Sequence, residues 1–273
     1  MEELVLTRYL FSYDEVKHSL FIEILDGNVG AALYWGYELY WSGYEEDTFE
    51  WLLKTYDLMF ELDEEFKKRI TGEYDEWKEN SELFEKFGTI IINMCYRPFS
   101  ISKFMNAFFN TQCIDNDNDK RNSNLYINMS KEDVSEYITL YGEIGGRYKI
   151  TKSLYKYDLR REMNELFRYD INKEEQLNSL FYNWEYYAIR CPYWRERFNK
   201  YGGYVKEGKV VFNTDDELEE FYNKYHLEID EMSKEVQNRV LGINELKAMS
   251  LKDFAKRYNG ILKTKKLKKK VVI

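Results

Sequence analysis

Two residues near the start of the chain have the spacing of a metal-binding motif. Glu15-x-x-His18 matches one half of a helical di-iron carboxylate site. Such a site needs a second copy of the motif, but the only other histidine, His226, has Asn223 in place of the glutamate. Ser12 and Glu15 also fit a capping box, in which the two residues bond each other's backbone N–H groups. We therefore interpret Glu15 as a capping residue and expect no di-iron site.

Asp115, Asp117 and Asp119 stand where an EF-hand calcium loop has its first three carboxylate ligands. The same loop requires a glycine for its sharp turn and a bidentate glutamate at its end. Lys120 and Tyr126 occupy those two positions. We therefore predict a polar surface loop here, and we expect no metal and no cofactor.

The three cysteines, Cys95, Cys113 and Cys191, are too scattered for a zinc motif or a disulfide framework. In the sequence around Cys191, only nearby arginines would lower the pKa of the thiol, so a buried structural thiol is the favoured interpretation. The chain also lacks a phosphate-binding loop and a serine nucleophile motif. We predict that the protein is not an enzyme, and we assign no catalytic residue.

Basic residues gather in two places in the C-terminal half. The final residues carry a lysine cluster that suits a nuclear-import signal or an arm for nucleic-acid phosphates, although a solvated terminus explains it equally well. A second group combines arginines with Tyr193 and Trp194, which would either stack on bases or belong to the core. The candidate nucleic-acid-binding residues are Arg190, Arg195, Arg197, Lys265, Lys266, Lys268, Lys269 and Lys270.

Aromatic residues make up 18% of the chain and are dense along one predicted helix, residues 29–41. They run around this helix and just beyond it, which is more than one core-facing stripe needs. We therefore expect some of them to face a partner protein. The candidate partner-binding residues are Tyr34, Trp35, Trp41 and Tyr44.

Charge is distributed unevenly along the 273 residues, whose formal net charge is −9. Residues 1–146 carry 13 basic and 29 acidic side chains, whereas residues 251–273 carry 9 basic and 1 acidic. The start of the chain is acidic where a signal peptide would be basic, and the longest apolar run, residues 89–94, is far too short to span a bilayer. We therefore expect an intracellular protein that is not secreted and has no membrane partner.

Hydrophobic spacing and helix signals predict a mainly α fold. Short connections between the first helices favour an irregular helical bundle or a short helical-hairpin array. Residues 61–82 are strongly charged and are expected to form a solvated helix or an extension, and residues 110–128 a loop. Two strands joined by Glu207-Gly208 have the pattern of a β-hairpin. Capping boxes are predicted at residues 12–15, 130–133, 214–217 and 250–253.

A glycine cluster at residues 142–146 coincides with the change in the sign of the charge, and we take it as a domain boundary. The predicted division is an acidic helical-hairpin domain at 1–146, a smaller helical unit at 147–260 with its hairpin near 203–213, and a basic tail at 261–273.

Two stretches of the sequence resemble a known group of proteins. The first reads FIEILDGN and then ALYWGYELYWSGY, and the second contains PYWRERF, YGG, EEFYNKY and SKEVQ. Together they resemble a poorly characterised family of nucleocytoplasmic large DNA viruses, of the mimivirus and iridovirus kind. The resemblance implies a viral origin, but it brings no assigned activity and no catalytic residues.

These observations lead to two hypotheses about function. The first is a non-enzymatic protein-interaction protein that acts in the virus factory or in the virion. The alternative is a nucleic-acid-binding accessory factor in viral replication or transcription that uses the basic C-terminal region. With a viral origin, the expected location is the host cytoplasm or the virus factory, or else the virion or the nucleus. The oligomeric state is left open.

Overall fold

The computed structural model describes residues 4–60, 64–115, 121, 124–138, 156–167, 173–225, 233–235 and 248–263. Most of the described residues are helical, and the only sheets among them are two short antiparallel ribbons. The predicted fold class, mainly α with one small β-hairpin in the C-terminal half, is therefore confirmed.

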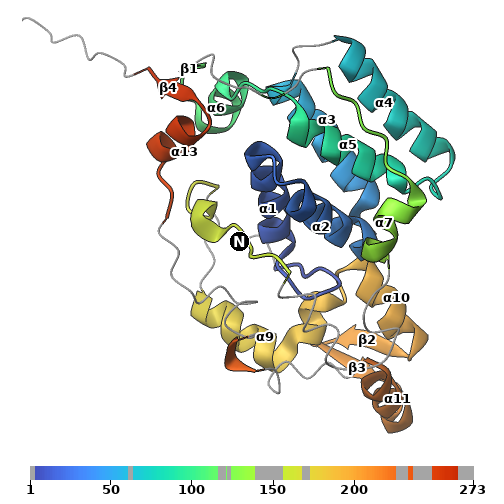
Figure 1. Cartoon of the computed structure of the whole chain (residues 1–273). Helices are drawn as coiled ribbons and strands as arrows, with labels where there is room; N and C mark the ends of the chain where they lie inside the picture. Colours follow the sequence, from blue (N-terminus) through green and yellow to red (C-terminus); the bar gives the residue numbers. More distant parts are fainter. Residues whose placement is uncertain are drawn as a thin grey trace, which may run out of the picture.

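The first helices form a packed array in which each contacts its neighbours in sequence and space (Figure 1). The strongest contacts join α1 to α2, α2 to α5, and α4 to α5. Gly27, with φ +72°, ends α1 where the sequence predicted a break, because only this left-handed turn returns the chain for α2. The elements are α1 (Tyr13–Asp26), α2 (Val29–Leu39), η1 (Tyr40–Tyr44), α3 (Glu45–Met59), α4 (Glu64–Glu79), α5 (Glu85–Tyr96), α6 (Ser102–Phe109) and α7 (Lys131–Ile138).

The helix predicted to be solvated, α4, is exposed on one side only. Its other side buries Phe66, Ile70 and Trp77 against the array. The Trp77 indole donates a hydrogen bond to the hydroxyl of Tyr40 over 2.9 Å. The prediction missed this buried side because the segment is mostly charged. A few apolar residues, placed one and two turns apart, are enough to form an apolar stripe along a helix.

At three of the four predicted sites the helix cap is confirmed, and at Ser130 and Thr214 the backbone N–H also donates to the acidic side chain three residues later, which completes the box. Ser130, Thr214 and Ser250 each accept a hydrogen bond from the backbone N–H three residues later. The prediction at Ser12 is wrong, since its side chain makes no capping bond and Glu15 instead accepts hydrogen bonds from Arg161. A buried arginine partner outcompetes the local bond because it also neutralises the carboxylate.

Within the described residues, the C-terminal unit comprises residues 173–225, in which two helices, a hairpin and a third helix surround an aromatic core. Glu207 and Gly208 both have positive φ, 51° and 76°, as the predicted two-residue hairpin turn requires. Trp194, Phe198 and Phe221 are fully buried beneath the hairpin and the helices. The elements are α9 (Lys173–Ala188), α10 (Pro192–Lys200), β2 (Gly203–Lys206), β3 (Lys209–Phe212) and α11 (Asp215–Tyr225).

A second ribbon joins residues that are far apart in the sequence. Strand β1 (Cys113–Asp115), within the segment predicted to be a loop, pairs antiparallel with β4 (Gly260–Leu262). The preceding helix, α13 (Leu251–Arg257), packs on α6 through Phe254, whose ring contacts those of Phe104 and Phe109. Figure 1 shows this end of the chain beside α6, at the opposite end of the molecule from the C-terminal unit. The predicted domain boundary at 142–146 lies outside the described residues. Residues 251–260, assigned to the C-terminal unit, and residues 261–262, assigned to the basic tail, pack on the N-terminal array.

Candidate interaction surfaces

Two of the four candidate partner-binding residues lie in the core. Trp35 is completely buried and packs edge-on against Phe11 and Tyr34, with ring centroids 5.3 and 4.8 Å apart. Tyr34 is also buried and contacts the ring of Tyr157. Neither side chain is available to a partner, because Phe11 and Tyr157, which are distant in sequence, pack over this part of α2. The sequence pattern of α2 alone does not indicate that this side is covered.

Trp41 and Tyr44 are half-buried in η1, a π-helical turn that follows α2. Trp41 packs against Phe84, and Tyr44 against Tyr13. Within this turn Gly43 has φ +89°, and a Cβ there would lie 2.5 Å from the Cβ of Pro192 at the start of α10. The turn η1 therefore forms part of the surface of the helical array against which the C-terminal unit packs.

A buried ion pair lies next to η1. The Arg8 guanidinium bonds the Glu38 carboxylate over 2.9 Å, and the backbone N–H of Tyr9 donates to the second oxygen of Glu38 over 3.0 Å. Burial raises the pKa of Glu38, and the charge of Arg8 opposes that rise. Ser42 accepts from the backbone N–H of Arg8 and donates to the Glu38 carbonyl, so the network is fully connected. It holds the N-terminal loop on α2.

The candidate arginines bind their own chain. Arg190 lies over the ring of Tyr186 and donates to the Leu4 carbonyl. Arg195 donates to the carbonyls of Ile189 and Arg190, the two residues that follow α9. Arg197 lies 3.2 Å from the ring centre of Tyr193. Trp194 is a core residue, so the arginines and the aromatic residues do not form an open stacking surface. Lys265, Lys266, Lys268, Lys269 and Lys270 lie outside the described residues.

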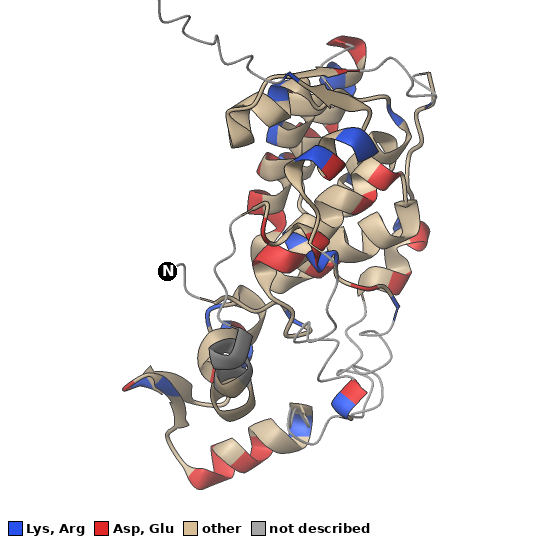
Figure 2. Cartoon of the chain, turned by 90° about the vertical axis from the view of Figure 1, so that its left-hand side faces the viewer, with Lys and Arg blue, Asp and Glu red and all other residues tan. Residues whose placement is uncertain are grey.

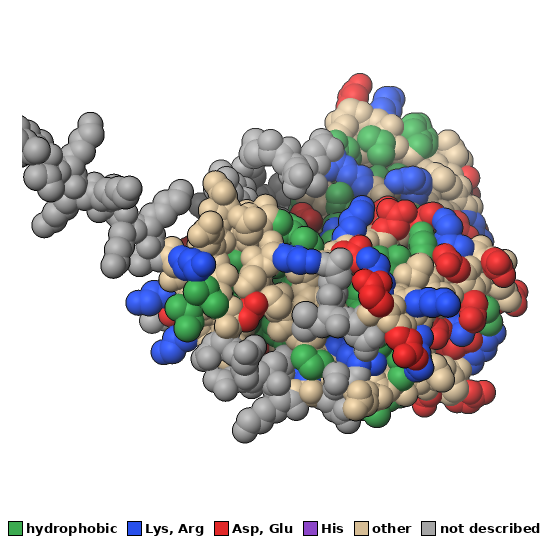
Figure 3. All heavy atoms as spheres, turned by 90° about the horizontal axis from the view of Figure 1, so that it is seen from above, with side chains coloured by type: hydrophobic (Ala, Val, Ile, Leu, Met, Phe, Trp, Pro, Cys, Tyr) green, Lys and Arg blue, Asp and Glu red, His purple; other side chains and the backbone are tan. Residues whose placement is uncertain are grey.

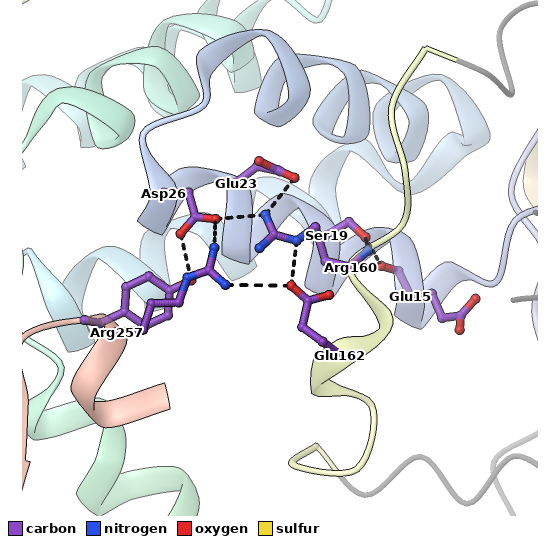
Figure 4. Close-up of polar contacts among 8 residues, drawn as sticks. Glu15, Ser19, Glu23, Asp26, Arg160, Glu162 and Arg257 are labelled. Atoms are coloured by element: carbon purple, nitrogen blue, oxygen red, sulfur yellow. Dashed lines mark hydrogen bonds and ion pairs between the residues drawn. The ribbon is translucent and has the colours of Figure 1, made fainter. Parts of the chain in front are cut away.

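The acidic residues along α1 meet arginines from two distant segments (Figure 4). Arg160 bonds Glu23 and Asp26 over 3.0 and 2.8 Å, while Arg257 of α13 bonds Asp26 over 2.5 Å. Arg161, which begins the short 3₁₀ helix η3 (Arg161–Met163), bonds Glu15 over 2.9 Å. This network holds residues 160–161 and α13 against α1.

The carboxylate and the imidazole of the Glu-x-x-His motif are engaged separately. Both oxygens of Glu15 bond Arg161, and the Asn164 amide donates to the first of them. His18 stacks on Phe167 with ring centroids 4.2 Å apart, and burial, with the nearby charge of Lys17, lowers its pKa to about 3. Within the described part of the chain, no cluster of three histidine, cysteine, aspartate or glutamate side chains is arranged to hold a metal ion.

The aspartate and cysteine motifs also have structural roles where they are described. Asp115 accepts hydrogen bonds from Ser100 and Ser102, while Asp117 and Asp119 lie outside the described residues. Burial raises the pKa of Cys191 to about 11, and its thiol donates to the Ser42 carbonyl. A thiol with this pKa stays protonated at neutral pH and is a poor nucleophile.

The C-terminal unit exposes large side chains that the sequence analysis did not single out. Tyr182 of α9 is 86% exposed, and Tyr204 and Val205 of β2 and Leu218 of α11 are also exposed. The amide of Asn183, the residue after Tyr182, donates to the carbonyl of Gly208 in the hairpin turn. Figure 2 shows this unit set apart from the helical array, with acidic residues along α11. Sequence pattern alone could not find Tyr182, since it sits among several tyrosines on the same helix.

Comparison with models of known protein families, with characterised proteins and with solved structures found no match to this chain. None of the described helices is long and apolar enough to cross a bilayer.

Proposed function

We propose that this protein is a non-enzymatic interaction protein that binds a partner protein through its C-terminal unit. The observation that carries the proposal is the 86% exposure of Tyr182 beside a hairpin whose own core is already filled. Exposed tyrosines supply much of the binding energy in protein interfaces because they bury a large area at little cost in conformational entropy. Tyr204 and Val205 are also exposed on β2, where consecutive side chains lie on opposite faces of the hairpin.

The charge of α11 supports a partner with a basic surface. Asp215, Asp216, Glu219 and Glu220 are exposed on α11, and their carboxylates would steer such a partner toward the exposed tyrosines. The reactive groups that the sequence offered, Glu15, His18 and Cys191, are engaged in buried structural contacts. This supports a binding role over a catalytic one. The resemblance to the large DNA virus family supports a place in the virus factory or the virion.

The proposal is tested by purifying the tagged full-length protein from infected cells, with nuclease treatment, and identifying what stays bound by mass spectrometry. A double variant, Tyr182→Ala with Tyr204→Ala, is expected to lose its partner and keep the melting temperature of the wild type. Tyr96→Ala is the matched control, because Tyr96 is an exposed tyrosine on α5 of the helical array.

Loss of the partner with the control variant, or retention with the double variant, contradicts the proposed surface. Partners that disappear on nuclease treatment of the wild type support the alternative function, an accessory factor that binds nucleic acid.

A further inference from the structure

The outer face of the β1–β4 ribbon carries two exposed isoleucines. Ile114 and Ile261 stand directly opposite each other in the ribbon and are 47% and 57% exposed. The side chain of Asp115, next to Ile114 in the strand, faces the molecule, since its carboxylate accepts a hydrogen bond from the Ser102 hydroxyl. Alternation along the strand therefore points both isoleucines away from α6. Two exposed apolar side chains side by side form a small patch, and exposed apolar patches can mark interaction sites.

Three exposed lysines lie close to Ile261 in the sequence. Lys263 follows Ile261 by two residues, which places it on the same face of the ribbon, and its backbone N–H donates to the Gln112 carbonyl. Lys252 and Lys256 are exposed on α13, the helix that leads into β4. Figure 3 shows hydrophobic side chains with basic ones beside them at this end of the molecule.

The acidic side chain within this segment is already engaged. The carboxylate of Asp253 accepts a hydrogen bond from the hydroxyl of Ser250 at the start of α13. The sequence after Lys263 adds five more lysines, Lys265, Lys266, Lys268, Lys269 and Lys270, and no acidic residue. In the sequence, Ile261 therefore lies directly before a strongly basic stretch.

We infer that this end of the molecule binds an anionic membrane surface, with Ile114 and Ile261 entering the headgroup region and Lys252, Lys256 and Lys263 lying against lipid phosphates. Anionic lipids attract clustered lysines, and exposed apolar side chains add the area that makes such binding persist. Isoleucine has no ring to stack on a base, so the pair favours a lipid surface over nucleic acid. Binding of this kind requires no membrane-spanning helix.

This inference rests on a different surface from the proposed function and stands or falls separately. The sequence led us to expect no membrane partner because it contains no apolar run long enough to span a bilayer. That reasoning addresses insertion through the bilayer and leaves binding at its surface open.

The test measures binding of the full-length protein to vesicles by co-sedimentation. One set of vesicles is phosphatidylcholine alone, and the other is equal parts phosphatidylcholine and phosphatidylserine. We expect binding to the second set only, and weaker binding as salt is added. Changing Lys252, Lys256 and Lys263 together to Gln is expected to lower the partition coefficient about a hundredfold, since each lysine contributes about fivefold.

A second variant tests the isoleucines. Ile114→Asn with Ile261→Asn is expected to lower binding at least about tenfold, because these side chains lose their apolar contact with the lipid. Val205→Asn on the hairpin is the control, as Val205 is also an exposed strand residue. The changed side chains are exposed, so the melting temperatures of the variants should match that of the wild type.

Three results would overturn the inference. The first is equal binding, or none, to the two sets of vesicles. The second is an isoleucine variant that binds as well as the wild type. The third is displacement of the protein from vesicles by a duplex oligonucleotide that binds it more tightly, which would assign this end of the molecule to nucleic acid.

Discussion

The indole N–H of Trp194 donates a hydrogen bond over 3.1 Å to the backbone carbonyl of Arg8, although the two residues are 186 positions apart. Both are buried, and the same carbonyl belongs to the loop whose arginine pairs with Glu38. The C-terminal unit is therefore fastened to the helical array through the beginning of the chain.

Replacing Trp194 with Phe should destabilise the protein by roughly 2–4 kcal/mol, because it leaves a buried carbonyl without a donor and opens a cavity. Urea unfolding followed by circular dichroism measures the change. A variant with the wild-type free energy of unfolding would mean that the bond does not hold the unit in place.

Gly43 and Gly72 offer a matched pair of substitutions. Gly43→Ala should lower the free energy of unfolding by roughly 2–4 kcal/mol, since the residue has a left-handed backbone and its new Cβ would press on Pro192. Gly72 lies within α4, and no other side chain or distant backbone atom comes within 4 Å of the position that a Cβ would take there. Gly72→Ala should therefore stabilise the protein by about 0.5–1 kcal/mol. Thermal unfolding of the two variants checks both signs, and equal shifts in the same direction would contradict the structure around Gly43.

His18 should make the protein less stable in mild acid. Burial lowers its pKa to about 3, so below the ordinary pKa of histidine the unfolded chain binds a proton that the native chain does not. The stability this group contributes is complete at neutral pH and is lost as the pH falls from about 6.5 toward 3. Between about pH 7.5 and about pH 5 the loss is expected to be about 2 kcal/mol.

The measurement is the difference in the free energy of unfolding between those two pH values, for the wild type and for His18→Gln. The variant should lose less stability on acidification, whatever its stability at neutral pH. An identical loss in both proteins would show that other groups control the acid response.

Asp26 should hold α13 against α1. Its carboxylate bonds Arg160 and Arg257 and accepts a hydrogen bond from the hydroxyl of Tyr258 over 3.0 Å. In Asp26→Asn, amide hydrogen exchange in residues 251–262 should rise about tenfold, since local opening becomes easier there. Exchange in α2 should not change. Asp57→Asn is the control, because Asp57 pairs with Lys67 at the surface; a rise in this control would argue against a specific role for Asp26.

Local signals in the sequence determined the helix starts at Ser130, Thr214 and Ser250, the hairpin turn and the break at Gly27. Each depends on hydrogen bonds between residues a few positions apart, as in the cap that Ser250 forms with the N–H of Asp253. Composition and spacing also determined that the protein is mainly helical. These features are readable in one sequence because both members of each interaction lie in the same short window.

The tertiary structure alone decided which residues became partners across the chain. Glu15 fits a local cap, yet it bonds Arg161, 146 positions away. Trp35 lies in an aromatic stretch from which we predicted a binding surface, yet Phe11 covers it. The pairing of Ile114 with Ile261 forms a ribbon within a segment that was predicted to be a loop. Such contacts leave no pattern in a single sequence, because a buried ion pair or a strand pairing depends on which segments the whole fold brings together.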